Sequence, residues 1–444
     1  MNLTYNIKDK PGFAKTLVFA LQQLLAIMAA TIAVPSIVGN GMSQTAALFG
    51  AGVGTLVYLA FTKFKSPVFL GSSFAFLGSM FAAFGGAASM EIGYAGLVIG
   101  ALLAGLVYVV LALVVKAVGV KWIDKLMPAV VIGPTVAIIG LSLAGNAIGD
   151  LTSNGTVGAA LGTSTYVSIV CGLVTLAVTM LCSVYGKKML KMIPFIIGIL
   201  AGYLVAVCFT LIGNAAGVDS LRVIDFSSFK SMQWLPDFTF LKAAKGLSGI
   251  DGSYLATVAV AYVPVAFVVF AEHIADHKNL SSIIGEDLLR EPGLHRTLLG
   301  DGVGSFAGAI FGGCPNTTYG ESIGCVAISG NASVVTILAT AVLAIVISFF
   351  GPFATFLATI PGCVMGGVCI ALYGYIAVSG LKMIQKVDLN SNRNLFVVCV
   401  ILIAGVGGLT VSFGQVTVTE VACALILGIL TNVMLSKEKT ESAE

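Results

Sequence analysis

Charged residues are scarce in this chain. Only 10% of its 444 residues are Asp, Glu, Lys or Arg, and the formal net charge is +3. A charged fraction this small excludes an ordinary soluble domain, in which about 25% of residues are charged. The sequence also has no basic stripe and no long acidic tail, so its charge pattern gives no indication of nucleic-acid binding.

Residues that carry enzyme or metal chemistry are also few. The chain has three histidines, and its nine cysteines form no CxxC pair. Each cysteine lies in or beside an apolar run, where we expect a small buried hydrophobe rather than a disulfide or a metal ligand. We find no His, Asp and Glu cluster with metal spacing and no nucleophile beside a base. The sequence therefore predicts neither an enzyme nor a bound metal or cofactor.

Apolar residues are what the chain has in abundance. Hydrophobic residues make up 58% of it, and the mean hydropathy is +1.03. Twelve clear runs are each long enough for a transmembrane segment, and two further stretches are apolar but crowded with Gly, Ser and Thr. Counting the two as broken spans gives fourteen. The twelve runs are 13–35, 45–62, 93–115, 122–144, 165–183, 190–214, 254–275, 295–312, 333–350, 352–378, 394–412 and 416–435, and the broken ones are 66–84 and 313–330.

The distribution of Lys and Arg supports this count. If the N-terminus is cytoplasmic, all but four of the 23 basic residues fall in inner loops. Short cytoplasmic loops are rich in Lys and Arg, whereas long loops escape this rule. The four exceptions share one long outer loop and are Arg222, Lys230, Lys242 and Lys245. We therefore expect a multi-pass protein of the cell membrane with both termini in the cytoplasm.

The long outer loop divides the chain into two halves of seven spans. We expect a first repeat over residues 1–217, an extracytoplasmic loop over 218–251, a second repeat over 252–436 and a cytoplasmic tail over 437–444. Seven is odd, so the second half must insert upside down relative to the first. Inverted repeats with discontinuous helices are typical of secondary transporters. The sequence thus predicts an all-α integral membrane fold with the broken spans third in each half.

The broken stretch Gly312–Gly324, GGCPNTTYGESIG, is the first candidate for a binding site. Irregular backbone survives at membrane depth only where it lines a cavity enclosed by protein. This stretch carries Glu321, and an ionised carboxylate at mid-bilayer costs about 2.5 kcal/mol or more. A role in binding substrate or proton is one interpretation of Glu321, and a charge satisfied by a helix N-terminus is the other.

Three further acidic residues lie in or at the edge of spans. Glu272 could belong to the site, or it could meet water at a span end together with His273, Asp276 and His277. Asp301 and Glu420 fit packing or interfacial groups better. Half-helix N-termini offer free N–H donors, and carboxylates accept hydrogen bonds from N–H groups. Such a site suits a small neutral planar solute, with an aromatic side chain, Phe74 or Tyr319, stacked on its face.

Four segments carry a family resemblance. LGSSFAF at 70–76, FAEHI at 270–274, DLLREPGLHR at 287–296 and NTTYGESIG at 316–324 resemble the nucleobase and ascorbate transporter family, also called nucleobase:cation symporter 2. Within it, the chain is most similar to the bacterial uracil permeases. The resemblance implies a core domain of spans one to four and eight to eleven, a gate domain of the remaining spans, and homodimers formed through the gate domains. It also implies short strands that lead into half-helices in spans three and ten.

The resemblance also implies roles for single residues. Carried over by position, Glu272 and Glu321 would accept hydrogen bonds from the N–H groups of a base, and the backbones of Phe74 and Gly320 would donate to its carbonyl groups. The side chains expected to pack around the ring are those of Tyr319 and Tyr373.

Three positions depart from the pattern of the uracil permeases. The first span reads Gln22-Gln23 where they have Gln-His, the eighth span has Asp276 in place of a second histidine, and Ser322 replaces an Asn after Glu321. These departures change hydrogen-bonding and titrating groups around the expected site. They weaken the choice of uracil more than the choice of family.

The functional expectation is proton-driven import of a nucleobase, most simply uracil, by alternating access. Glu272 would carry the proton, tuned by Asp276 or His277. A permease for xanthine, other purines or a broad range of bases is the alternative within the family. An anion exchanger or channel with the same inverted-repeat fold is the alternative from another class, although two carboxylates at the site argue against an anionic substrate.

Overall fold

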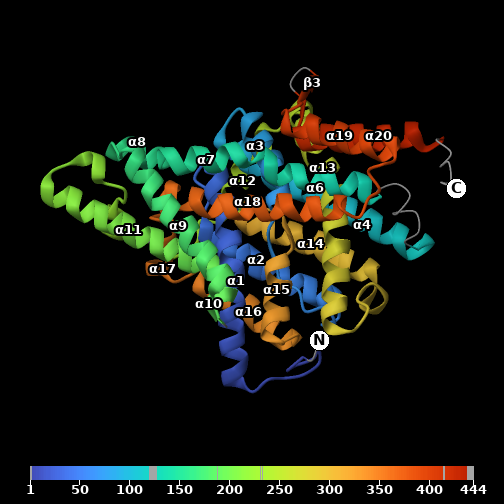
Figure 1. Ribbon diagram of the computed structural model, residues 1–444, viewed down its shortest axis with the longest axis horizontal. Coiled ribbons are helices and arrows are strands. Elements are labelled where there is room, and N and C mark those ends of the chain that lie inside the picture. Colours follow the sequence, from blue (N-terminus) through green and yellow to red (C-terminus); the bar gives the residue numbers. More distant parts are fainter. Residues whose placement is uncertain are drawn as a thin grey trace.

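The fold is described by a computed structural model that covers residues 3–119, 128–187, 189–230, 232, 234–413 and 416–437. It is almost entirely helical (Figure 1). The helices of the first half are α1 (Phe13–Val38), α2 (Gln44–Phe61), α3 (Leu77–Gly85), α4 (Met90–Val118), α6 (Ala129–Ser142), α7 (Ala144–Ser153), α8 (Gly155–Leu161), α9 (Thr165–Tyr185), α10 (Met189–Met192) and α11 (Pro194–Ala216).

The second half follows a connection that contains the short helix α12 (Thr239–Gly246). Its helices are α13 (Gly252–Ile284), α14 (Leu294–Gly312), α15 (Gly320–Ser329), α16 (Val334–Ile347), α17 (Gly351–Ala358), α18 (Gly362–Ile384), α19 (Asn392–Val406) and α20 (Glu420–Met434). Four short strands complete the fold and form two antiparallel pairs, namely β1 (Leu70–Ser72) with β2 (Asn316–Thr318) and β3 (Val411–Phe413) with β4 (Val416–Val418).

Helix length and composition identify a multi-pass membrane protein. Within the described residues, eight helices are long and apolar enough to cross a membrane, or up to nine if the bent pair α16 and α17 forms one span. The other expected spans correspond to shorter or more polar helices, so the count of fourteen stays a prediction. The expected tail after residue 437 and the first residues of the run at 122–144 lie outside the described residues.

Both broken stretches of the sequence are broken in the structure. In each, a short extended strand runs into a short helix: β1 leads through the turn Phe74–Phe76 into α3, and β2 leads through Tyr319 into α15. The two strands pair with each other in antiparallel register, with Gly71 opposite Thr317. All six strand residues are buried, so the backbone groups satisfy each other inside the protein, as membrane depth requires.

Helix contacts recur between the two halves. The contact of α1 with α16 has its counterpart in that of α13 with α4, and α2 with α16 matches α14 with α4. Likewise α9 with α11 matches α19 with α20, and α9 with α18 matches α19 with α6. Three contacts map onto themselves, namely α2 with α14, α6 with α18 and β1 with β2. This is the pattern that a two-fold pseudosymmetric repeat produces, and it agrees with the inverted repeat that the sequence predicts.

The helices form two groups. One consists of α1 to α4 and α13 to α16, which pack on one another around the paired strands. In the other group α6 and α18 lie side by side, with α9 and α11 at one end and α19 and α20 at the other (Figure 1).

Two boundaries differ from those expected. The run 352–378 is interrupted between α17 and α18, because Pro352 starts one helix and Pro361 caps the next. Pro is favoured at such positions and disrupts a helix that already runs. The runs 394–412 and 416–435 are helical only in part, since the hairpin β3 and β4 fills the space between α19 and α20. Its β-branched valines and threonines favour strand.

An N-terminal strap, which we define as residues 4–9, packs against the segment 330–334 that links α15 to α16. Tyr5 forms a parallel bridge with Asn331. The backbone N–H groups of Ala332 and Val334 donate to the carbonyls of Tyr5 and Ile7 at 2.9 and 3.1 Å. The pseudosymmetric counterpart is α12, which precedes α13 and packs on α4, with Gly246 against Glu91 in the first turn of α4. The strap thus contacts the C-terminal end of the half-helix α15, in the opposite repeat.

Candidate functional site

A cavity of about 380 Å³ lies between the two groups of helices. One wall comes from the broken segments and α13, and the other from α6, α11 and α18. The residues that line it are Ser73, Phe74, Ala75, Ile132, Val136, Ile139, Phe195, Glu272, Ala275, Asp276, Thr317, Thr318, Tyr319, Gly320, Glu321, Leu372, Tyr375, Ile376, Ser379 and Met383. Six of the eight site residues expected from the sequence are among them.

Three carboxylates face this cavity. Glu272 and Asp276 are four residues apart on α13, which places them one above the other on the same helix face. Glu321 lies in the first turn of α15, where the N–H groups of a helix N-terminus are free. The hydroxyl of Thr318 donates to Oδ2 of Asp276 at 2.8 Å. Among the described residues no Lys, Arg or His lines the cavity, so the walls carry only negative or neutral groups.

Aromatic rings and exposed backbone complete the wall. Phe74 meets the ring of Tyr373 edge-on, with 5.9 Å between centroids. Tyr373 itself lies behind Phe74 and is not among the lining residues, whereas Tyr375 is. Gly320 is exposed to the cavity, and a Cβ added there would touch nothing within 4 Å. The backbone at this helix N-terminus is thus open to a ligand.

Tyr319 fixes the two strands relative to each other. Its hydroxyl donates to the carbonyl of Ser72 at 2.8 Å and its side chain is 4% exposed. The ring lies so close to Gly71 that a Cβ there would come within 2.3 Å of it. Only glycine leaves room for the ring at this position, so the strand pair and the aromatic wall depend on each other.

Comparison with known proteins fits this arrangement. A family model described as the permease family matches residues 14–413. The chain belongs to this permease family. The resemblance noted in the sequence is thereby confirmed, and a permease is a transporter rather than an enzyme.

Several curated relatives are similar over nearly their whole length. The uracil permease of Bacillus caldolyticus is 39% identical over 437 residues, covering 97% of this chain and 94% of the relative. The uracil permease of Escherichia coli (strain K12) is 35% identical over 425 residues, covering 95% and 92%. A putative pyrimidine permease of the same strain is 30% identical over 443 residues, covering 97% and 91%.

Solved structures share the fold at low identity. The transmembrane domain of a cyanobacterium bicarbonate transporter, BicA, superposes with a TM-score of 0.64 at 16% identity, covering 96% of this chain and 99% of that one. The murine anion transporter Slc26a9 in its inward-facing state gives 0.63 at 14%, covering 97% and 69%. These likenesses identify the architecture of the permease and say nothing about its substrate.

Two of the departures from the uracil permeases contact each other in this permease. The amide of Gln23 on α1 donates to the hydroxyl and the carbonyl of Ser322, at 2.5 and 3.2 Å. The same hydroxyl accepts from the backbone N–H of Phe69 at 3.2 Å. Gln23 and Ser322 are buried and do not line the cavity. They hold the start of α15, and with it Glu321, from behind.

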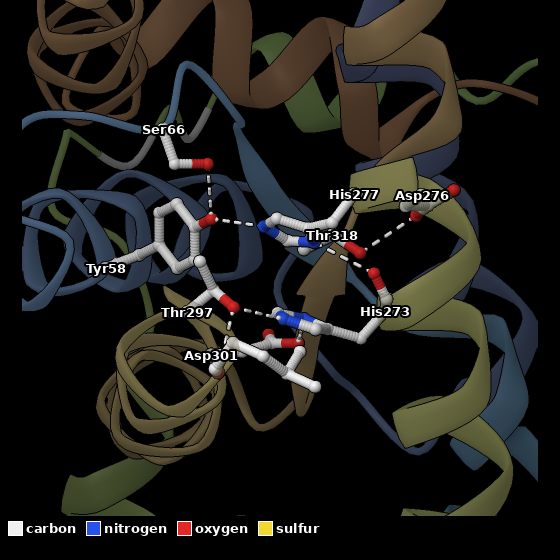
Figure 2. A network of polar contacts seen from close by, with 9 residues as sticks. Tyr58, Ser66, His273, Asp276, His277, Thr297, Asp301 and Thr318 are labelled. Atoms are coloured by element: carbon white, nitrogen blue, oxygen red, sulfur yellow. Dashed lines mark hydrogen bonds and ion pairs between the residues drawn. The ribbon is translucent and has the colours of Figure 1, made fainter. Parts of the chain in front are cut away.

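A buried polar network lies on the other face of α13 (Figure 2). Nδ1 of His273 is 2.7 Å from Oδ2 of Asp301, and Nε2 is 2.9 Å from the hydroxyl of Thr297. The rings of His273 and His277 stack with 4.0 Å between centroids. Asp301 is 1% exposed, and its other carboxylate oxygen has no hydrogen-bond partner in the described part of the chain. Asp301 is therefore a packed, paired group behind the cavity.

His277 belongs to this network and not to the cavity wall. Its Nδ1 lies 2.8 Å from the carbonyl of His273, which can only accept, so Nδ1 carries a proton. Its Nε2 is 2.7 Å from the hydroxyl of Tyr58, which is also 2.7 Å from that of Ser66. In the neutral ring, Tyr58 therefore donates to His277 and Ser66 donates to Tyr58. The role expected for His277 in proton coupling stays a prediction, and any such role acts through α13.

Several wall residues were not expected from the sequence. Ser73 and Thr317 line the cavity with hydroxyl groups that have no hydrogen-bond partner among the described residues. Thr318 and Tyr375 also line it. The signal for the first three is their place in the broken segments, where small polar residues interrupt an apolar run. Tyr375 sits in an apolar helix, and no local signal distinguishes it from a packing residue.

Proposed function

We propose that this permease imports a nucleobase, with uracil the favoured substrate, by symport with protons. The observation that carries the proposal is the cavity between the helix groups, in which carboxylates face the N-termini of two half-helices. The relatives named uracil permeases support the choice of uracil. A bicyclic or broad-range base permease remains the second candidate, because Asp276 adds a third carboxylate to the wall.

Each part of a planar base has a proposed partner. Glu272 and Glu321 accept hydrogen bonds from its ring N–H groups, and the backbone N–H groups at Phe74 and Gly320 donate to its carbonyls. The rings of Phe74 and Tyr319 pack against its faces, and Tyr373 supports Phe74 from behind. The protein thus offers N–H donors to the carbonyls of the base and carboxylate acceptors to its N–H groups. No positive side chain takes part, which suits a neutral base better than an anion.

Proton coupling follows from the crowding of carboxylates. Neighbouring carboxylates in a cavity poor in water cannot all be ionised at low cost, so one of them binds a proton more readily when substrate is present. We assign the carried proton to Glu272, tuned by Asp276. A membrane potential contributes about 2.3 kcal/mol per charge per 100 mV, which is enough to drive accumulation of a neutral base.

The two helix groups correspond to the proposed core and gate domains. The cavity is lined on the gate side by Ile132 near the start of α6, Phe195 at the start of α11 and Met383 at the end of α18. With the basic loops in the cytoplasm, these ends face inward, so the proposed state is open to the cytoplasm. Movement of the core against the gate would then expose the site to the other side. We further propose homodimers through the gate helices.

Uptake of labelled uracil into proteoliposomes tests the proposal. An inward proton gradient is applied, with a protonophore and unlabelled xanthine in parallel samples. We expect concentrative uptake that the protonophore abolishes and that xanthine leaves unchanged. Uptake that xanthine blocks would favour the second candidate. Absence of uracil and xanthine uptake by folded protein would overturn the assignment to nucleobases.

A further inference from the structure

The cavity wall holds more hydrogen-bonding groups than uracil uses. Uracil has two ring N–H donors and two carbonyl acceptors. In the proposed pose Glu272 and Glu321 accept the two donors, and the half-helix N-termini serve the two acceptors. Asp276 is then left without a ligand partner, although it lines the same cavity.

Asp276 is placed to accept one more hydrogen bond. Its Oδ2 already accepts from Thr318 at 2.8 Å, which fixes the direction of the carboxylate. The side chain is half-buried and lies one helical turn beyond Glu272, with Cβ atoms about 5–6 Å apart. A donor on a ligand bound at Glu272 is therefore within reach of Asp276 when it projects from the ring edge toward the end of α13.

A second observation points to an additional ligand group. The hydroxyls of Ser73 and Thr317 line the cavity without a hydrogen-bond partner in the described residues, and these side chains are only 1% and 4% exposed. Buried hydroxyls nearly always have a partner, and an unpaired one is costly. They lie on the broken segments, which form the same wall of the cavity as α13. This wall therefore has free polar groups beyond those that uracil would use.

We propose that Asp276, oriented by Thr318, is a specificity-determining acceptor for a third N–H donor on the substrate. This inference rests on the proposed nucleobase function and narrows it. Uracil fits the site without using Asp276, and a base that adds an amino substituent or a further ring N–H, such as an aminated pyrimidinedione, would bind more tightly. A donor that bonds to Asp276 strengthens binding of that base relative to an analogue without the donor, which leaves the carboxylate with Thr318 as its hydrogen-bond partner.

Equilibrium binding to the purified full-length protein tests this inference. The probes are uracil, 5-aminouracil, 6-aminouracil and xanthine, each measured by calorimetry at one pH. We expect at least one base with the extra donor to bind about tenfold more tightly than uracil, which is the effect of roughly one additional charge-assisted hydrogen bond. Asp276→Asn should remove this ratio, so that the bases with the extra donor bind no more tightly than uracil.

Further variants separate specificity from folding. Thr318→Val removes the hydroxyl that orients Asp276 and should reduce the ratio, and Thr318→Ser should restore it. Glu420→Gln neutralises a carboxylate outside the cavity and should leave the ratio unchanged. If uracil binds and the ratio is near one, or if it survives in Asp276→Asn, the inference is wrong and the proposed function stands. If folded protein binds none of the four bases, the proposed function falls as well.

Discussion

The two broken segments have the same backbone plan and different chemistry. In each a buried three-residue strand leads into a short helix, and the strands pair with each other. The first segment contributes Phe74 and no charged side chain, whereas the second contributes Glu321. The other two cavity carboxylates are on α13, so all three come from the second repeat. Backbone symmetry thus does not require chemical symmetry: the second repeat supplies the charges.

The first repeat acts largely as a support for the second. Gln23 on α1 holds Ser322, Thr31 on α1 lies 3.5 Å from the hydroxyl of Tyr319, and Tyr58 on α2 bonds to His277. Each contact reaches a residue next to a carboxylate or to the strand pair. The comparison therefore predicts that charge substitutions in the second repeat affect transport directly. Substitutions in the first repeat should instead affect the position of the site residues and the stability of the fold.

Neutralising Glu272 should have the largest effect on transport. Glu272→Gln keeps the size of the side chain but cannot carry a proton, so we expect concentrative uptake to be abolished in proteoliposomes. Glu321→Gln should weaken base binding severely for the same loss of charge. Phe74→Leu in the first repeat should retain measurable coupled uptake. Accumulation at the wild-type level by Glu272→Gln would show that this residue does not carry the proton. It would also contradict the prediction that charge substitutions in the second repeat affect transport.

Breaking the pair of His273 and Asp301 should have the largest effect on stability. Asp301→Ala leaves His273 without its buried hydrogen-bond partner, and an unsatisfied buried polar group costs about 1–3 kcal/mol, to which the cavity left by the side chain adds. α1 has only Lys15 as a charged residue and α2 has none, so the first repeat holds no equivalent pair between these helices. Thermal unfolding in detergent measures the effect, with Asp301→Asn as the milder control. An unchanged melting temperature in Asp301→Ala would show that the pair does not stabilise the fold.

Two glycines allow a direct comparison of the broken segments. A Cβ at Gly71 would collide with the ring of Tyr319, and one at Gly320 would meet nothing within 4 Å. We expect Gly71→Ala to destabilise the protein by about 1–3 kcal/mol, the usual result of overpacking a buried site. Gly320→Ala should unfold at nearly the wild-type temperature, although it can hinder ligand entry. Equal melting temperatures for the two variants would contradict the close strand packing described above.

The contact of Gln23 with Ser322 should give the smallest effect. Gln23→Ala and Ser322→Ala each remove one partner of a buried hydrogen bond, and we expect a coupling energy of about 1 kcal/mol in a double-mutant cycle. Affinity for the base, measured by calorimetry, is the readout, because the contact holds α15 behind Glu321. Fully additive changes would show that the two residues act separately.

Much of the fold and of the site can be predicted from the local sequence. Gly, Ser, Thr and Pro inside apolar runs mark the broken segments, and the spacing of Glu272 and Asp276 places both on one helix face. What sequence could not provide is the rotation of α13 about its axis. His273 and His277 each lie one residue, or about 100°, from these carboxylates, and that rotation turns them toward Tyr58 and Asp301 instead of the cavity.

Contacts between residues far apart in the chain could not be predicted from the sequence either. The pairing of Gly71 with Thr317 and the contact of Phe74 with Tyr373 join residues far apart in the chain, and no local preference specifies them. The interruption before α18 could have been inferred from Pro361, because proline disrupts a running helix and is favoured where a helix begins. The place of Tyr375 in the cavity wall could not be inferred, because the exposure of a residue in an apolar helix depends on the helices that pack against it.

The N-terminal strap constrains the order in which the permease is assembled. Residues 4–9 precede the spans in the chain, and their backbone partners at 330–334 are made more than three hundred residues later. The strap must therefore stay without these partners while the helices between them are synthesised. The strap can pair with the segment after α15 only once that segment has been made. This contact between the two repeats therefore forms late in biosynthesis.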